Sequence, residues 1–392
     1  MFLQIVKSKY KTLQPIPRFR AVAHGAGVTG SASGAAHGVT GGGSASPVTP
    51  TTTAELVSYL TDSSPRVILI TKTFDFRGTL GTTTATGCVP TSNTCGSSGK
   101  NAINANGWCG SASATTVKYD NAGTTPIQVK SNKSIVGVGS AGVIIGRGLY
   151  LSGVSNIIIQ NVHITNFNPS LIWGGDAITL VGTDLIWIDH CKFSLIGRQM
   201  LVTGYNAAGR LTISNNEFDG QTSWSATCNG QHYWTMLFYG AADYVTLANN
   251  YIHHCSGRAP KVGGSSGDAI TMHAVNNYFY NVAGHDFDIG VGAAVLLKGN
   301  YFQSVTTPIT AASSSAGGSI FTTASGTEST CTAYLGRACV ANAVSSSGAF
   351  PGYGTTSFLA TIKTKESGYV PAAIAASSVP AYVVAHAGIG KL

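Results

Sequence analysis

From residue 130 onwards, β-forming residues alternate with small or polar ones in short segments that recur along the chain. Each segment then reaches two small polar positions, which are followed by aromatic or aliphatic residues. Six segments share this form: 156–164, 185–193, 211–218, 245–252, 270–279 and 295–302. The alternation is typical of short strands and shows no helical periodicity. The pattern therefore predicts an all-β region built from repeated strands.

Alignment of the six segments places the two small polar positions in two columns. The first column contains Asn161, His190, Asn215, Asn249, Asn276 and Gly299, and the second contains Val162, Cys191, Asn216, Asn250, Asn277 and Asn300. Members of the first column are 29, 25, 34, 27 and 23 residues apart. These intervals indicate a solenoid with loop insertions of different lengths, and they are too short for the blades of a β-propeller, which span about 40–50 residues. Stacked Asn side chains can bind neighbouring turns, so we interpret them as structural.

The ends of the chain differ from the repeats in composition. Residues 22–53 are rich in Gly, Ala, Ser and Thr, which predicts an ordered loop or a flexible entry. Residues 356–392 contain Ala-rich stretches compatible with helix, and we expect them to pack against the solenoid as a structural cap. Residues 1–26 are interpreted as a leader or an unassigned N-terminal segment, although residues 1–25 lack the apolar stretch of a signal peptide.

The composition describes a folded chain with few charges. Charged residues make up 10% of the sequence, against about a quarter in an average globular protein, and 43% of the residues are hydrophobic. The net charge of +8 admits nucleic acid, an anionic surface or an acidic polysaccharide as a partner. No Lys/Arg run lies on a predicted element, which argues against nucleic acid. No apolar run approaches the roughly 20 residues of a membrane helix, which argues against a membrane.

The cysteines point to an oxidising compartment. Eight cysteines in a chain with few charges indicate disulfides, and the absence of any Cys-x-x-Cys pair argues against structural zinc. The glycosylation sequon at Asn132 is compatible with a secreted glycoprotein.

Five motifs, in order along the chain, carry a family resemblance: Trp173-Gly174-Gly175-Asp176-Ala177-Ile178-Thr179, Trp187-Ile188-Asp189-His190, Ile196-Gly197-Arg198-Gln199, Ser256-Gly257-Arg258-Ala259-Pro260-Lys261-Val262 and His273-Ala274-Val275-Asn276-Asn277-Tyr278. Together they resemble the pectin lyase branch of the pectate lyase superfamily, polysaccharide lyase family 1. The resemblance implies a single right-handed parallel β-helix domain over residues 27–392. It also implies a secreted monomer that degrades pectin, meaning methyl-esterified homogalacturonan.

The implied reaction is β-elimination, which needs a base and a cation. The base removes the proton at C5 of a galacturonosyl residue, and the cation stabilises charge on the neighbouring carboxyl oxygens. The resemblance assigns the base to Arg258 and places Lys261 beside the substrate carbonyl. Deprotonating a free guanidinium at pH ~8.5 costs about 5 kcal/mol. We expect Lys261 and Arg198 to lower this cost through like-charge repulsion.

Asp176 decides between two kinds of lyase. In calcium-dependent pectate lyases the matching carboxylate helps to hold the metal, which takes six to eight oxygens. Here Arg198 stands where those enzymes supply further acidic ligands, so we expect it to replace the ion and pair with Asp176. The pectate-type Arg-x-Pro-x-x-Arg pattern also ends in Gly263 instead of Arg. The resemblance therefore implies a pectin lyase without a metal or other cofactor, and a calcium-dependent pectate lyase is the alternative.

The resemblance also assigns aromatic residues and disulfides. Sugar rings pack on aromatic surfaces, and the matching cleft positions are Trp173, Tyr233, Trp234 and Trp108. Two departures are Thr91, where the family often has Trp, and Leu237, where an aromatic residue is expected. The implied disulfides pair Cys88 with Cys109, Cys95 with Cys228, and Cys331 with Cys339. Cys191 and Cys255 remain, and we expect them to be buried free thiols.

Two other functions are compatible with a β-helix. A hydrolase would use paired carboxylates, for which Asp286 and Asp288 are the candidates because a spacing of two puts both on one face of a strand. A noncatalytic pectin-binding protein would keep the solenoid and lose the catalytic residues. The presence of Arg258, Lys261, Asp176 and Arg198 argues against this second alternative.

Overall fold

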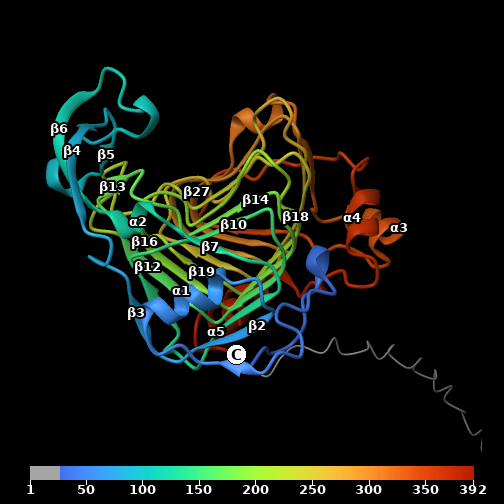
Figure 1. Ribbon diagram of the computed structural model, residues 1–392. Coiled ribbons are helices and arrows are strands. Elements are labelled where there is room, and N and C mark those ends of the chain that lie inside the picture. The colour runs from blue at the N-terminus through green and yellow to red at the C-terminus, as the bar shows by residue number, and fades with distance from the viewer. Residues whose placement is uncertain (1–26) are drawn as a thin grey trace, which may run out of the picture.

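The computed structural model describes residues 27–392, so the leader expected over residues 1–26 lies outside the described part of the chain. Strands from successive coils pair in parallel and build a right-handed parallel β-helix (Figure 1). The all-β solenoid predicted from the repeats is therefore confirmed. No helix among the described residues is long and apolar enough to cross a lipid bilayer.

Three parallel faces enclose the core of the β-helix. The second and third faces share strand β25, which turns the corner between them and joins them into one sheet. The first face consists of β1 (Pro47–Val48), β2 (Arg66–Ile70), β8 (Lys133–Gly137), β11 (Ser155–Gln160), β15 (Asp184–Asp189), β18 (Gly209–Ser214), β21 (Asp243–Ala248), β24 (Ile270–Val275), β26 (Ala293–Lys298) and β28 (Ser319–Thr322). The second consists of β3 (Thr73–Asp75), β9 (Val143–Ile145), β12 (His163–Phe167), β16 (Lys192–Ile196), β19 (Glu217–Asp219), β22 (Tyr251–His253), β25 (Tyr278–Ile289), β27 (Tyr301–Ile309) and β29 (Ala343–Ser345). The third consists of β7 (Ile127–Val129), β10 (Leu149–Ser152), β14 (Ile178–Val181), β17 (Leu201–Thr203), β20 (Met236–Phe238), β23 (Lys261–Val262) and the end of β25.

Apolar side chains stack from coil to coil inside the three faces. On the second face, Phe193 stacks on Phe218 with ring centroids 5.1 Å apart, and Phe279 stacks on Phe302 at 4.7 Å. Burying such a side chain is worth about 1.5–3 kcal/mol, so each coil stabilises the next. One inward column of the first face, at most 2% exposed at each position, consists of Ile157, Ile186, Leu211, Val245, Met272 and Val295.

The two predicted columns lie at the bend between the first and second faces. Every member of the first column has a left-handed backbone, with φ between 49° and 63°, a conformation that Asn and Gly adopt more readily than most residues. In the second column the side-chain oxygen of each Asn accepts from the residue before it in the column, as from Cys191 to Asn216 at 2.8 Å and from Asn216 to Asn250 at 3.0 Å. The ladder extends to Asn342, which the repeats did not predict and which accepts from Asn300 at 3.0 Å.

The N-terminal residues 27–53 are ordered and cover the outside of the first face. The short 3₁₀ turn η1 (Gly34–Ala36) donates from Ala35 to Thr246 and from Ala36 to Thr212. Helix α1 (Thr53–Thr61), which the strand pattern did not predict, then packs fully buried Leu56 and Leu60 against the core.

The C-terminal segment packs against the solenoid, as predicted, and it does so along the side of the β-helix. The backbone of Gly388 donates to the carbonyl of Asn215 at 2.8 Å, and that of Gly390 donates to Oδ1 of Asn161 at 2.7 Å. Ile374 and Asn276 exchange two further hydrogen bonds. The bends of the first Asn column present backbone and side-chain polar groups on this side of the β-helix, and the C-terminal segment forms hydrogen bonds with these groups.

Short helices and 3₁₀ turns occupy the rest of the periphery. They are α2 (Asn121–Thr124), α3 (Thr332–Leu335), α4 (Leu359–Lys365), α5 (Val379–His386), η2 (Gly96–Ser98), η3 (Ala105–Gly107), η4 (Ala311–Ser314), η5 (Glu328–Cys331) and η6 (Ala376–Ser378).

Residues 82–120 leave the solenoid as an arm, drawn in cyan tones in Figure 1. Strands β4 (Thr82–Val89) and β6 (Ser113–Asp120) form its antiparallel hairpin, and β5 (Asn101–Ile103) links β4 to β13 (Leu171–Ile172). One disulfide joins Cys88 to Cys109 within the arm, and a second joins Cys95 of the arm to Cys228. A third joins Cys331 to Cys339, so the pairs are those that the family resemblance implied.

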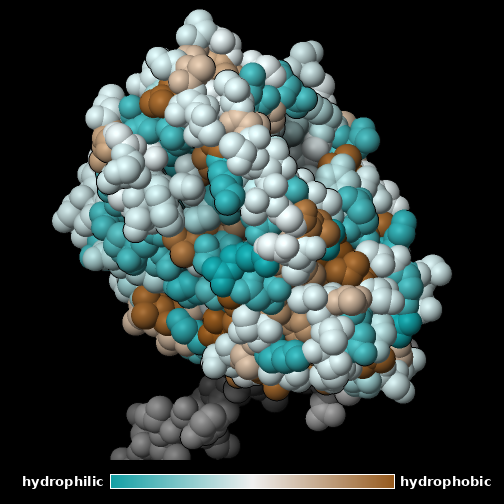
Figure 2. Space-filling model, turned by 60° about the vertical axis from the view of Figure 1, so that its left-hand side comes forward, coloured by the Kyte–Doolittle hydropathy of each residue, from teal (hydrophilic) through white to brown (hydrophobic). Residues whose placement is uncertain are grey.

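The surface reflects the low charge of the sequence. On the face drawn in Figure 2, most residues have near-neutral hydropathy, and hydrophilic and hydrophobic residues are scattered in small groups. This appearance matches a chain with 49 Gly and only 10% charged residues.

Candidate active site

A cleft lies over the outer surface of the third face, with the arm on one side. Its floor is a column of outward side chains in register across five strands: Tyr150, Thr179, Val202, Leu237 and Lys261. The turns next to these strands contribute further lining residues, which include Trp173, Asp176, Arg198, Tyr239 and Arg258. The fold thus gathers the four predicted catalytic residues on one face, although they span more than eighty positions of the sequence.

Asp176 and Arg198 form a two-point ion pair in this cleft. Arg198 Nε donates to Oδ1 at 2.9 Å and Nη2 donates to Oδ2 at 2.6 Å. The backbone of Gln199 adds a third donor to Oδ1 at 2.8 Å. Such paired, charge-assisted bonds fix both position and orientation. The guanidinium also lies 3.8 Å from the ring centroid of Trp173, so it is held from two directions.

Arg258 occupies a different environment from Arg198. Its backbone is left-handed, with φ of 47°, and its carbonyl accepts from Met236 at 2.6 Å. The backbone N–H donates to Nε2 of His285 at 3.3 Å, which requires that nitrogen to be unprotonated. Burial lowers the pKa of His285 below its ordinary value, which favours this neutral state. Within residues 27–392, no carboxylate lies within ion-pair distance of the Arg258 guanidinium.

Lys261 stands in the floor of the cleft beside Asp288. The two residues are register partners on β23 and β25, and their Nζ–Oδ2 distance is 2.7 Å. Arg198 and Lys261 therefore each have a carboxylate partner, and only Arg258 of the three cations has none among the described residues. The like-charge repulsion expected from the sequence is weaker in this arrangement, because Asp176 and Asp288 balance the two neighbouring charges.

The four predicted aromatic residues divide into two groups. Trp108 at 42% exposure, Trp173 and Trp234 line the cleft together with Arg258. Tyr233 lies under the catalytic candidate instead: the Arg258 guanidinium is 5.9 Å from its ring centroid, and the ring packs against Trp234 at 5.3 Å and against His285 at 5.9 Å. The sequence interpretation did not assign Tyr150, Thr179, Tyr205 and Tyr239 to the cleft lining. Thr179 lies in a family motif but was given no role, and the three tyrosines lie outside the motifs.

Lys100 is a supporting residue that the sequence interpretation also missed. It is 1% exposed, and its Nζ donates to the carbonyls of Ile196 and Gly197, both at 2.9 Å. Nδ1 of His232 lies 3.4 Å from the same Nζ, while Nε2 of His232 lies 2.7 Å from the carbonyl of Arg198. The arm thus holds the backbone that carries Arg198. Burial lowers the pKa of Lys100 to about 7 and that of His232 to about 3.

The carboxylates proposed for a hydrolase do not form a pair. Asp286 is fully buried, neither of its carboxyl oxygens has a hydrogen-bond partner among the described residues, and burial raises its pKa well above the ordinary value. Asp288 faces outward and binds Lys261. The two carboxylates do not share an environment despite their spacing of two, because β25 passes from the second face to the third in this region. This geometry argues against paired-carboxylate hydrolysis.

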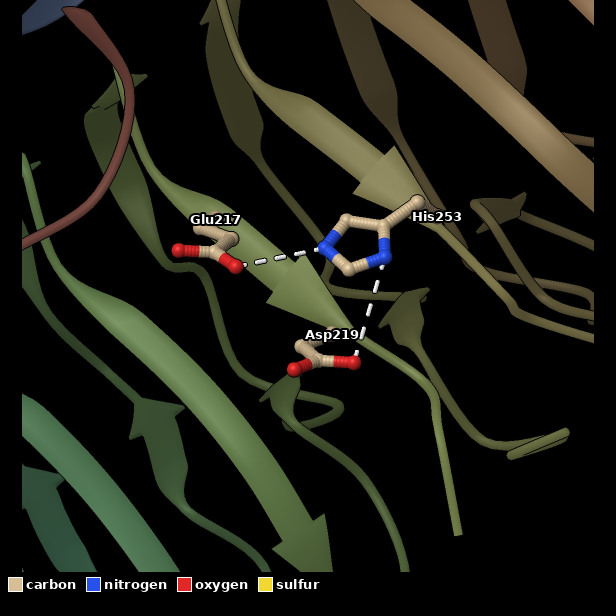
Figure 3. Close-up of side chains that lie close together, drawn as sticks. All are labelled: Glu217, Asp219 and His253. Atoms are coloured by element: carbon tan, nitrogen blue, oxygen red, sulfur yellow. Dashed lines mark hydrogen bonds and ion pairs between the residues drawn. The ribbon is translucent and has the colours of Figure 1, made fainter. Parts of the chain in front are cut away.

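A separate acidic cluster lies on the outer surface of the second face. Glu217 and Asp219 of β19 point toward His253 of β22 (Figure 3), and one potential ligand atom from each lies within 4.8 Å of the others. The ammonium group of Lys192 already lies 2.8 Å from Glu217 and 3.0 Å from Asp219. We interpret the cluster as an ion-pair network in which Lys192 supplies the positive charge.

Cys191 and Cys255 are free and fully buried, as expected from the sequence. Burial raises the pKa of each thiol to about 12, so both remain protonated and unreactive at neutral pH.

Comparisons with known proteins agree with this geometry. The family model described as pectate lyase matches residues 20–392. "Probable pectin lyase F" of Aspergillus niger is 55% identical over 370 residues, which cover 93% of this chain and 76% of that protein. "Pectin lyase B" of Emericella nidulans is 53% identical over 376 residues, which cover 94% and 95%. The solved pectate lyase of Acidovorax avenae subsp. citrulli shares the fold, with a TM-score of 0.56 at 18% identity over 96% of this chain and 99% of that one.

Proposed function

Because this chain belongs to the pectate lyase family, we propose that it is an endo-acting pectin lyase. It cleaves methyl-esterified (1→4)-α-D-galacturonan by β-elimination and releases 4,5-unsaturated oligosaccharides. Relatives that are 50–55% identical carry the name pectin lyase, which supports this substrate class.

Arg258 acts as the base in this proposal. It takes the proton from C5, the electron pair forms the C4–C5 double bond, and the bond from C4 to the glycosidic oxygen breaks. Lys261 and Arg198 face the carboxyl ester, where negative charge develops. The observation that carries the assignment is the contrast among the three cations: Arg198 and Lys261 each have a carboxylate partner, and Arg258 has none among the described residues.

The Asp176–Arg198 pair accounts for the preference for esterified substrate. A divalent cation at Asp176 would have to displace a guanidinium that is held by two hydrogen bonds and by Trp173. A methyl ester is neutral and needs no bridging cation. We therefore propose that neither calcium nor any other cofactor takes part.

We further propose that the protein is a secreted monomer acting on pectin outside the cell, with no nucleic-acid or membrane partner. The three disulfides support an oxidising compartment. Glycosylation at Asn132 stays a prediction; the side-chain Oδ1 of Asn132 accepts from Nδ2 of Asn156 at 2.8 Å.

An ultraviolet assay of the unsaturated product tests the proposal. The protein is assayed on highly methylated pectin and on polygalacturonate, each with and without a chelator. We expect turnover of methylated pectin that a chelator does not change. Activity that favours polygalacturonate and is lost in chelator would identify a calcium-dependent pectate lyase. Binding of pectin without any unsaturated product would identify a noncatalytic wall-binding protein.

A further inference from the structure

Two tyrosines form a pair at the edge of the cleft on the third face. Tyr205 follows β17 and Tyr239 follows β20, two neighbouring strands of the cleft floor. Their ring centroids are 4.7 Å apart, and the rings meet edge to face at 78°. Neither residue is part of the family motifs recognised in the sequence, and neither belongs to the proposed catalytic group.

The Tyr205 ring is unusually open to solvent. Tyr205 as a whole residue is 73% exposed, the highest value among the exposed large hydrophobic residues of the described chain. Trp108, at 42%, is the other strongly exposed aromatic residue of the cleft. An aromatic ring left in water forgoes the stabilisation that burial would provide, so a cleft that keeps such a ring exposed is equipped to bury it against a ligand.

The backbone holds the pair in place. The carbonyl of Tyr205 accepts from Ala241 at 3.1 Å, and the N–H of Tyr239 donates to Thr203 Oγ1 at 3.0 Å. A side chain at Gly204 would place its Cβ 2.6 Å from Val181, so the turn before Tyr205 packs closely on the neighbouring coil. A preorganised platform of this kind loses little conformational freedom when a ligand binds.

The surroundings of the pair indicate the chemistry of that ligand. The two rings line one pocket with Tyr150, Thr179 and Asn206, and its charged residues are Asp176 and Arg198, which balance each other. Tyr239 also lines the adjacent pocket that contains Arg258. The pocket that the two rings line therefore offers aromatic rings, carries no net side-chain charge, and shares Tyr239 with the pocket that contains Arg258. A pyranose ring with a neutral methyl ester matches such a surface better than a free carboxylate does.

We propose that Tyr205 and Tyr239 form a sugar-binding subsite that stacks on a methyl-esterified galacturonosyl residue away from the bond that is cleaved. This inference rests on the proposed pectin lyase function and specifies how the same cleft binds a longer chain. The subsite lies in the turns that follow β17 and β20. It is next to Leu237, the floor position where the family resemblance predicts an aromatic residue.

The test compares how catalysis improves with substrate length in the wild type and in Tyr205→Ala. Methyl-esterified oligogalacturonides of increasing length are assayed by absorbance of the unsaturated product. We expect kcat/KM to rise with length in the wild type, and we expect Tyr205→Ala to reduce that rise about five- to tenfold. Tyr205→Phe keeps the ring, so it should retain most of the rise. Tyr382→Ala is the matched control, because Tyr382 is an exposed tyrosine on α5 that stacks on His386 outside the cleft.

A second measurement does not depend on turnover. Native gels that contain methyl-esterified pectin should retard the wild type and Tyr382→Ala more strongly than Tyr205→Ala. Equal retardation of wild type and Tyr205→Ala, or an unchanged length dependence, would overturn the subsite. A loss of the same size in Tyr382→Ala would overturn it too. A wild type that releases no unsaturated product would refute the lyase proposal, while the gel still decides whether the tyrosines bind the polymer.

Discussion

Arg198 places its guanidinium against the carboxylate of Asp176, with Nε–Oδ1 at 2.9 Å and Nη2–Oδ2 at 2.6 Å. Both side chains are partly buried in the cleft, so solvent screens the pair only in part. In a double-mutant cycle with Asp176→Ala and Arg198→Ala, we expect a coupling of about 1–3 kcal/mol in the free energy of unfolding. Urea denaturation of the four proteins measures it. Additive single effects would show that the two residues are independent.

Arg258 should be the residue whose loss affects turnover most. Lysine keeps the charge but moves it onto a shorter, differently shaped group, so Arg258→Lys should misplace the base. We expect kcat to fall at least about a hundredfold. Arg210→Lys is the matched control, because Arg210 lies on β18 of the first face and pairs with Asp184. Thermal melts show whether both variants fold, and substantial activity in a folded Arg258→Lys protein would rule out arginine as the base.

Lys100 should make the stability of the folded protein depend on pH above neutrality. Burial lowers its pKa from the ordinary 10.5 to about 7, so between these values the folded protein binds fewer protons at this site than the unfolded chain does. Stability linked to this group therefore rises with pH across that window. We expect the stability of the wild type relative to Lys100→Met to increase from pH 7 toward pH 10. Denaturant titrations at several pH values test this.

The same substitution should affect catalysis through Arg198. The Nζ of Lys100 donates to the carbonyls of Ile196 and Gly197, directly before Arg198. Loss of these bonds should lower kcat/KM on methylated pectin by about tenfold. An unchanged kcat/KM together with an unchanged pH dependence would show that the arm does not position the site through Lys100.

The features that the sequence predicted are those that repeat locally. Strand alternation and the paired polar positions recur in six segments, so the solenoid and the Asn columns follow from the order of residues alone, and the family resemblance adds the parallel β-helix. Lys100 acts on Gly197, which is 97 positions away, and no repeat links the two. Tyr205 and Tyr239 come together because turns after neighbouring strands lie side by side. Contacts of this kind depend on the lengths of the loops, which the repeat pattern leaves undetermined.

Glu217 should contribute stability that is lost in acid. Burial alone would raise its pKa, but hydrogen bonds from His253 and Lys192 and the charge of Lys192 lower the pKa to about 2. The contribution is complete above the ordinary value of 4.5 and disappears as the pH falls through about 2. We therefore expect Glu217→Gln to be less stable than the wild type at pH 6, and this difference to shrink between pH 4.5 and 2. A difference that stays constant over this range would contradict the ion-pair network around Lys192.

Asn250 should be among the most important single residues for stability of the solenoid. Its fully buried side chain accepts from the backbone and the amide of Asn216, and it donates to Ile213 at 3.0 Å and to Asn277 at 2.9 Å. Asn250→Ala leaves these partners unsatisfied in the core, and we expect a loss of about 3 kcal/mol in the free energy of unfolding. The neighbouring Asn249 is the control: it has a left-handed φ of 56° and no side-chain hydrogen bond among the described residues, so Asn249→Ala should cost about 1 kcal/mol. Urea denaturation compares the two, and an Asn250→Ala protein no less stable than Asn249→Ala would show that the ladder contributes little.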